Sequence, residues 1–211
     1  MPDFKTFINR LKQNLALPLP GIQAQLSMVP PTRKKELKAV DPGDKAKPSA
    51  VLILLYSDGG NIYFPLIQRA TYNGIHSGQV AFPGGQYETK DKDLKITALR
   101  EAREEINTDP KKIGIIGELT PLYIPPSNFV VYPFVGFTTK KPGFKVDNTE
   151  TKAVIEVKLS DFLYPGNRTI KSIHHRTDKD IEVPCFYLNN KIVWGATAMI
   201  LSELYAVIER N

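Results

Sequence analysis

The segment GGQYETKDKDLKITALREAREEIN, residues 84–107, begins with two glycines and ends in a predicted helix rich in glutamate. At 3.6 residues per turn, one apolar stripe runs along this helix and contains Leu94, Ala98, Leu99, Ala102 and Ile106. Glu101 and Glu105 lie at the edge of the stripe, and Glu104 lies just beyond them. The helix therefore has an apolar face for a core and carries its carboxylates where it meets that core.

The crowding of these glutamates has two interpretations. Like charges one helical turn apart repel by about 0.2–0.5 kcal/mol per pair, and Arg100 and Arg103 offset part of this cost, as in an ordinary solvated helix. The Pro-Gly-Gly sequence at residues 83–85 favours a second interpretation, because glycine lets the backbone approach a ligand closely. Hard divalent cations such as Mg²⁺ bind through carboxylates and substrate phosphates. The segment therefore predicts a metal site.

The rest of the chain predicts an α/β fold, with a mixed sheet and helices on its faces. Apolar runs bounded by turn residues predict strands at residues 50–56, 62–69, 79–82, 113–124, 129–139, 153–159, 168–175, 181–188 and 191–194. Apolar residues at helical spacing predict helices at residues 3–15, 93–107 and 196–210, with a short helical turn at 160–163. The glycine turn SDGGN joins the first two strands into a predicted hairpin.

The chain is predicted to consist of two parts. Residues 1–49 form a helix and a proline-rich extended arm, and residues 50–211 form one domain. The arm has two interpretations: it forms the contact of a homodimer, or it covers an edge of the domain.

Composition excludes several classes of protein. No apolar run approaches the roughly 18 residues of a membrane span, and no secretory signal is expected at the start of the chain. Cys185 is the only cysteine, which excludes an intrachain disulfide and a cysteine metal cluster and favours a cytoplasmic location. The net charge of +6 suits an anionic partner. The basic residues are spread along the chain, and no nucleic-acid motif and no membrane partner are predicted from them.

The sequence REAREEIN at residues 100–107, preceded by PGG, resembles the Nudix hydrolase family. The Nudix motif contains a first glutamate eight positions before the arginine, and here that position is Lys92, between Asp91 and Asp93. Either aspartate is a candidate replacement for this glutamate. The late glycine of the motif is replaced by Asn107, which tolerates the left-handed backbone of a helix end. The resemblance implies a Nudix-type α/β/α sandwich around a mixed β-sheet over residues 50–211.

A second stretch resembles the coenzyme A pyrophosphatase branch of that family. Within LIQRATYNGIHSGQVAFPGG, residues 66–85, the matching residues are Arg69, Gly78, Phe82, Pro83, Gly84 and Gly85. Gly74 stands where that signature often has an arginine. The resemblance implies hydrolysis of coenzyme A or its thioesters, dependent on Mg²⁺ or Mn²⁺, to 3′,5′-ADP and 4′-phosphopantetheine.

The resemblance also implies roles for the residues of the glutamate helix. Glu101 and Glu105 are the predicted metal ligands, and Glu104 is a third ligand or the group that orients the attacking water. Gly85 brings the backbone to the metal, and Arg100 supports the glutamates.

Residues outside the helix complete the predicted site. Arg69, Gly84 and His76 are predicted to contact the substrate, with Arg69 pairing with a phosphate. A catalytic base is expected in a later loop, where Glu150 is favoured over Asp147 and Glu156 because it precedes a strand.

Other functions stay open at the level of sequence. The same chemistry on ADP-ribose, NADH or another nucleotide is the nearest alternative. Lys92 alone motivates a non-catalytic nucleotide sensor, and the basic charge alone motivates an RNA-binding or decapping protein.

Overall fold

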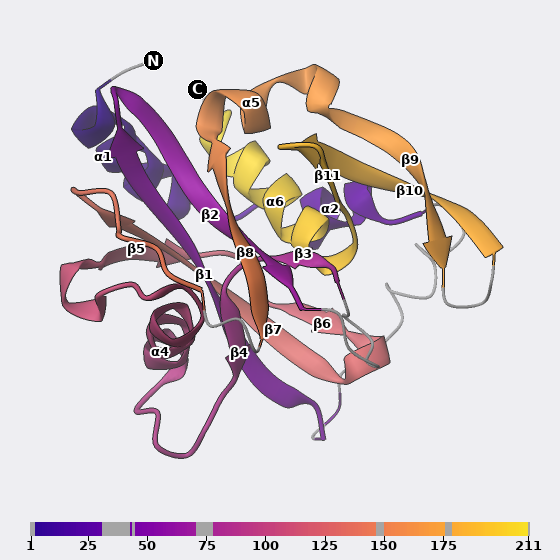
Figure 1. Cartoon of the computed structure of the whole chain (residues 1–211), viewed down its shortest axis with the longest axis horizontal. Helices are drawn as coiled ribbons and strands as arrows, with labels where there is room; N and C mark the ends of the chain where they lie inside the picture. Colours follow the sequence, from indigo (N-terminus) through magenta and orange to yellow (C-terminus); the bar gives the residue numbers. More distant parts are fainter. Residues whose placement is uncertain are drawn as a thin grey trace.

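A computed structural model describes residues 3–30, 43, 45–70, 78–146, 150–175 and 179–210, and Figure 1 shows the arrangement of their helices and strands. The main sheet has eight strands and contains the path β3-β2-β1-β7-β5. Off this path, β4 pairs with β1, β6 pairs with β7, and β8 pairs with β2. The pairing of β1 with β7 is parallel and the other pairings are antiparallel, so the sheet is mixed, as predicted.

The strands of the main sheet are β1 (Lys47–Asp58), β2 (Asn61–Arg69), β3 (Val80–Ala81), β4 (Gly84–Gln86), β5 (Gly114–Glu118), β6 (Leu122–Ile124), β7 (Phe129–Thr138) and β8 (Thr151–Lys158). A second, three-stranded antiparallel sheet contains β9 (Arg168–His175), β10 (Lys179–Leu188) and β11 (Lys191–Val193). The α-helices are α1 (Phe4–Leu15), α2 (Gly21–Gln25), α4 (Leu94–Ile106), α5 (Leu159–Leu163) and α6 (Gly195–Ile208). Short 3₁₀ turns occupy Leu26–Met28, Pro110–Lys112, Pro125–Ser127 and Pro165–Asn167.

Strand β1 lies inside the molecule and is apolar on both faces. Ala50, Leu52 and Leu54 pack in a small cluster with Ala98 and Ala102 of α4. Their neighbours along the strand belong to the larger cluster on the opposite face of the sheet, which also contains α1 and α6. The continuous apolar run AVLILLY is therefore explained by burial on both sides, and the predicted α/β/α sandwich is confirmed.

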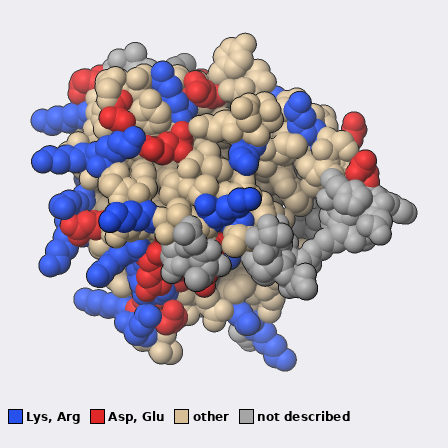
Figure 2. Space-filling model, viewed as in Figure 1, with Lys and Arg blue, Asp and Glu red and all other residues tan. Residues whose placement is uncertain are grey.

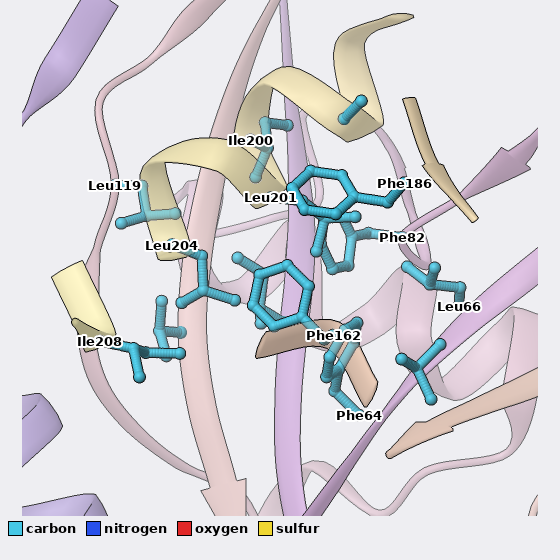
Figure 3. Close-up of a cluster of buried hydrophobic side chains, with 14 of the residues drawn as sticks. Phe64, Leu66, Phe82, Leu119, Phe162, Phe186, Ile200, Leu201, Leu204 and Ile208 are labelled. Atoms are coloured by element: carbon cyan, nitrogen blue, oxygen red, sulfur yellow. The ribbon is translucent and has the colours of Figure 1, made fainter. Parts of the chain in front are cut away.

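The larger cluster is centred on aromatic side chains beneath α6 (Figure 3). The ring of Phe162 is fully buried, and its centroid lies 5.5 Å from that of Phe64 and 5.3 Å from that of Phe186. These distances are typical of favourable aromatic pairs. Phe162 therefore joins α5 to β2 and to the second sheet.

Residues N-terminal to the main sheet also enter this cluster. Leu11, Leu26 and Met28 are buried in it, so residues 17–30 are not merely extended but include α2 and a 3₁₀ turn packed against α6. The buried carboxylate of Glu203 accepts hydrogen bonds from Gln25 Nε2 at 2.8 Å and Thr120 Oγ1 at 2.6 Å. The division of the chain at residue 49 and a homodimer through the arm remain predictions.

Two predicted strands differ in the structure. The predicted strand at 113–124 is divided into β5 and β6, because the pairing with β7 shifts by one residue between Leu119, whose N donates to Pro133 O, and Leu122, which pairs with Val131. Pro121 lies in this interval and has no N–H to donate. The Pro-Gly-Gly sequence does not simply end a strand: residues 84–86 form β4 and pair with β1. The predicted hairpin of β1 and β2 is confirmed, and Gly59 and Gly60 form its turn with positive φ.

Among the described residues, no helix is long and apolar enough to cross a membrane. This agrees with the absence of long apolar runs from the sequence.

Replacement of Phe162 by alanine is expected to lower the free energy of unfolding by about 3–5 kcal/mol, because it removes a large side chain from a packed core. Urea unfolding measures this change. Tyr164→Ala, at a residue that is 63% exposed two positions along the chain, is the control. It is expected to change stability by no more than about 0.5 kcal/mol. Equal losses in the two variants would contradict the assignment of Phe162 to the core.

Candidate functional site

The glutamate helix α4 begins and ends at residues with specific capping geometry. Asp93 is its N-cap, and the side chain of Asp93 accepts a hydrogen bond from Ile96 N at 2.8 Å. Asn107 ends the helix in the left-handed conformation, with φ of 58°. Both features were predicted from the sequence. They fix the rotation of the helix, which turns Glu101 and Glu105 toward β4.

Glu105 is the most buried of the three glutamates, with 4% of its surface exposed. Its Oε2 accepts a hydrogen bond from Gly84 N at 2.8 Å, and its Oε1 lies 3.8 Å from Arg69 Nη1. Burial raises the pKa of Glu105 to about 7, because the loss of water outweighs the favourable effects of Gly84 N–H and Arg69. The structure thus brings three predicted site residues, Arg69, Gly84 and Glu105, together.

Glu101 lies directly against Gly85. A Cβ atom at residue 85 would lie 2.5 Å from Glu101 Oε1, so any side chain there would displace the Glu101 carboxylate from its present position. Burial raises the pKa of Glu101, although the guanidinium of Arg100 acts in the opposite direction. Gly85 therefore has a steric role beside the carboxylate, in the place predicted for it.

Arg100 is the centre of an ion-pair network, and 13% of its side chain is exposed. Its Nε and Nη2 donate to the two oxygens of Asp91, each at 2.9 Å. Its Nη1 donates to Glu101 Oε1 and to Glu104 Oε2, also at 2.9 Å. The side chain of Glu104 is half exposed. Arg100 thus separates these two glutamates and supports them, as predicted.

The structure resolves the alternatives left by Lys92. Asp91 is buried and, besides Arg100, accepts hydrogen bonds from Thr97 Oγ1 at 2.9 Å and Glu88 N at 3.1 Å. These donors hold the pKa of Asp91 at about 2, with Arg100 as the largest cause. Asp93 serves as the helix cap, and Lys92 is exposed. Asp91 therefore provides the carboxylate partner of Arg100. It lies one position before Lys92, which stands at the place of the first glutamate of the motif.

Glu150 lies near the helix carboxylates. Its backbone oxygen accepts a hydrogen bond from Ala70 N at 2.9 Å, and its negative charge contributes to raising the pKa of both Glu101 and Glu105. The alternative base Glu156 lies elsewhere, where Tyr56 Oη donates to it and Lys141 Nζ lies at 2.9 Å. The remaining candidates, His76 and Asp147, lie outside the described residues.

The donor atoms at this site fit a hard divalent cation. Two carboxylates with raised pKa values, Glu101 and Glu105, lie beside a glycine whose missing side chain leaves room next to Glu101. Within the described ranges, no three acidic, histidine or cysteine side chains are already arranged around one point. Glu104, to which Arg100 donates, is a further candidate ligand, and phosphate and water oxygens would complete the coordination.

The Asp91–Arg100 pair makes a prediction about stability. Asp91→Ala leaves a largely buried guanidinium without its main partner and is expected to lower the free energy of unfolding by about 3 kcal/mol at pH 7. The pKa of Asp91 is lower in the folded protein (about 2) than in the unfolded chain (about 3.9). The stabilisation by its charge is therefore complete above pH 4 and is lost as the pH falls toward 2.

Urea unfolding of the wild type and the variant at pH 7 and pH 3 measures this difference. The gap between the two proteins should be smaller at pH 3. Lys92→Ala serves as the control and is expected to match the wild type within about 0.5 kcal/mol. A gap that is independent of pH would show that the Asp91 charge contributes little.

Comparison with known proteins places this geometry in a family. The family model described as the NUDIX domain matches residues 46–175. An "Uncharacterized Nudix hydrolase NudL" from Photorhabdus laumondii is 34% identical over 143 residues, which are 66% of this chain and 73% of that protein. A protein of the same name from Salmonella paratyphi B is 36% identical over 139 residues, 66% of this chain and 71% of the relative.

A plant protein extends the comparison. "Nudix hydrolase 22, chloroplastic" from Arabidopsis thaliana is 32% identical over 170 residues, which are 78% of this chain and 56% of that protein. The chain thus spans about half the length of this relative. Because the family model covers more than half of the chain, the protein belongs to the Nudix family of hydrolases, which cleave phosphoric anhydride bonds and generally require a divalent metal ion.

Proposed function

We propose that this Nudix hydrolase cleaves the pyrophosphate bond of coenzyme A or its thioesters. The products are 3′,5′-ADP and 4′-phosphopantetheine or its acyl form. Support for the substrate comes from the sequence of residues 66–85, which resembles the signature of coenzyme A pyrophosphatases. Support for the chemistry comes from one observation: two carboxylates whose pKa values are raised, Glu101 and Glu105, lie beside the close glycine backbone and near Glu150.

Glu101 and Glu105 would hold the metal, with Glu104 as a further ligand and the backbone of Gly85 beside it. Mg²⁺ or Mn²⁺, when bound there, would polarise the phosphoryl oxygens and make a bound water more acidic. Arg100 keeps Glu101 and Glu104 oriented through its 2.9 Å contacts with both.

Residues around the metal ligands complete the reaction. Glu150, which precedes β8, accepts the proton of the attacking water. Arg69 binds a phosphate oxygen with its terminal nitrogens, because Glu105 Oε1, at 3.8 Å, is too far away to form a full hydrogen bond with it. Gly84 uses its N–H to fix Glu105, and its missing side chain lets β4 lie close against β1. Coenzyme A carries several phosphates, and basic side chains gather along one edge of the molecule in Figure 2, where α1, β5 and α4 lie.

We favour hydrolysis over the sensor hypothesis. It rested on Lys92 at the position of the first glutamate of the motif, and Asp91 provides the missing carboxylate. Hydrolysis of ADP-ribose, NADH or another nucleotide remains the second candidate, since it uses the same site. A cytoplasmic location, with no nucleic-acid or membrane partner, belongs to the proposal on the grounds of composition.

A substrate panel tests the proposed function. Purified protein with Mg²⁺ or Mn²⁺ is offered coenzyme A, ADP-ribose, NADH and deoxynucleoside triphosphates, and the products are separated by chromatography. Release of 3′,5′-ADP from coenzyme A is expected to be the fastest cleavage and to stop when the metal is chelated. Faster cleavage of another nucleotide would reject the substrate and keep the chemistry. No turnover of any substrate would reject the proposal.

Glu105→Gln tests the metal site. The variant is expected to lower turnover of coenzyme A at least about 100-fold, because it removes a charged ligand. It should fold as stably as the wild type, because burial already disfavours the charge of Glu105. Turnover by chromatography and urea unfolding measure the two effects. Glu118→Gln, at an exposed position of β5, is the control and should retain full turnover. Unchanged turnover in Glu105→Gln would remove the metal-site assignment.

A further inference from the structure

Two buried polar atoms belong to residues that are paired between strands β2 and β8. Arg69 Nε and Thr151 Oγ1 are each inaccessible to solvent, and neither has a hydrogen-bond partner in the described part of the chain. Arg69 and Thr151 are paired in the ladder, next to a register shift between Gln68 and Arg69. Arg69 lies on the face of the sheet that carries α4, because its Nη1 is 3.8 Å from Glu105 Oε1, and Thr151 is its neighbour on the adjacent strand.

This location adjoins the proposed phosphate site. Arg69 Nη1 lies 3.8 Å from Glu105 Oε1, whereas the other oxygen of Glu105 accepts from Gly84 N. Glu150, the proposed base, immediately precedes Thr151. Thr151 is itself fully buried, while the side chain of Arg69 is 26% exposed. The terminal nitrogens of Arg69 can therefore reach a substrate, and Thr151 is its buried neighbour on β8.

An unpaired buried hydroxyl costs about 1–3 kcal/mol. Valine has nearly the same shape as threonine and would avoid this cost. Two of the four unpaired buried side-chain atoms found among the described residues occur at this one ladder position. Proteins tolerate local losses of stability mainly at functional sites. A functional role would therefore explain why Arg69 Nε and Thr151 Oγ1 are both buried without a described partner.

We propose that Thr151 is a positioning residue for Arg69, through one water molecule bound by Thr151 Oγ1, Arg69 Nε and Glu105 Oε1. Facing side chains of paired strands have Cβ atoms about 5 Å apart, a spacing that one bridging water fits. Buried water usually makes about three hydrogen bonds. Here Arg69 Nε–H donates to the water, and the water donates to Glu105 and to Thr151. The guanidinium is thereby fixed with its terminal nitrogens directed to the substrate phosphate. This inference rests on the proposed function.

Thr151→Val tests the proposal by kinetics. The KM for coenzyme A is expected to rise about tenfold, the equivalent of one hydrogen bond to a charged group, while kcat stays within about twofold because no reacting atom is touched. Thr151→Ser retains the hydroxyl and should restore the wild-type KM. An unchanged KM in Thr151→Val would overturn the proposal.

Thr108→Val is the matched control. Thr108 Oγ1 is also buried and unpaired within the described part of the chain, but it lies beyond the C-terminal end of α4. Its replacement removes the same group and is expected to leave KM unchanged. An equal rise of KM in Thr108→Val would show that the effect is not specific to Thr151. If Thr151→Val does not fold, Thr151→Ala removes the same hydroxyl.

A second measurement is independent of turnover. The Arg69 Nε–H resonance, assigned by its loss in Arg69→Lys, is followed by ¹⁵N NMR without substrate or metal. Its hydrogen exchange is expected to be slow in the wild type and in Thr151→Ser, and at least about tenfold faster in Thr151→Val, since one hydrogen bond is lost. Equal exchange in all three proteins would overturn the positioning role. If the wild type hydrolyses nothing, the proposed function fails, while the exchange rates still decide the contact between Thr151 and Arg69.

Discussion

The close approach of β4 to its two neighbours, β1 and α4, is the constraint on which the site depends. A Cβ atom at Gly84 would lie 2.3 Å from Ala50 O, and one at Gly85 would lie 2.5 Å from Glu101 Oε1. A side chain at residue 84 would force the backbone of β1 to move, and one at residue 85 would displace the Glu101 carboxylate. The small residues Ala98 and Ala102 continue the same close contact between α4 and β1. The glutamates reach the edge of the sheet because the backbone beneath them has no side chains.

The electrostatics of the site follow from that burial. Two influences act on Glu105: loss of water favours its protonated form, and Gly84 N–H and Arg69 favour its charged form. The loss of water dominates, and the same order holds for Glu101 despite its contact with Arg100. Asp91 shows the opposite balance, because it accepts from both arms of one guanidinium and from a hydroxyl. Charge in the site is therefore uneven. On one side, the guanidinium of Arg100 is fully paired with carboxylates. On the other side lie carboxylates with too little positive charge near them, and a metal would bind there.

Sequence patterns that involve only neighbouring residues were sufficient to predict much of the fold. The glycine turn between β1 and β2, the apolar stripe of α4 and its capping residue Asp93 each depend on neighbours in sequence, and each was predicted. The aspartate partner of Arg100 was left open between Asp91 and Asp93, because counting along the motif leads to Lys92. Asp91 takes the role since Glu88 N and Thr97 fix the loop before the helix, and this arrangement exists only in three dimensions. Similarly, the unpaired hydroxyl of Thr151 depends on the register of β2 and β8, which the sequence does not reveal.

The contacts between the first helices, α1 and α2, and the last helix, α6, affect how the protein folds during synthesis. Asn14 Nδ2 donates to Val207 O at 2.9 Å, and Gln25 reaches Glu203 on the same helix, α6. These contacts connect residues separated by 193 and 178 positions. While the chain is still being translated, α1 can dock on β5 and β7, but both α1 and α2 lack their contacts with α6, so part of their apolar surface remains exposed until α6 leaves the ribosome. Such long-range closure slows folding and prolongs exposure to aggregation, which makes the N-terminal segment a natural site for chaperones to bind.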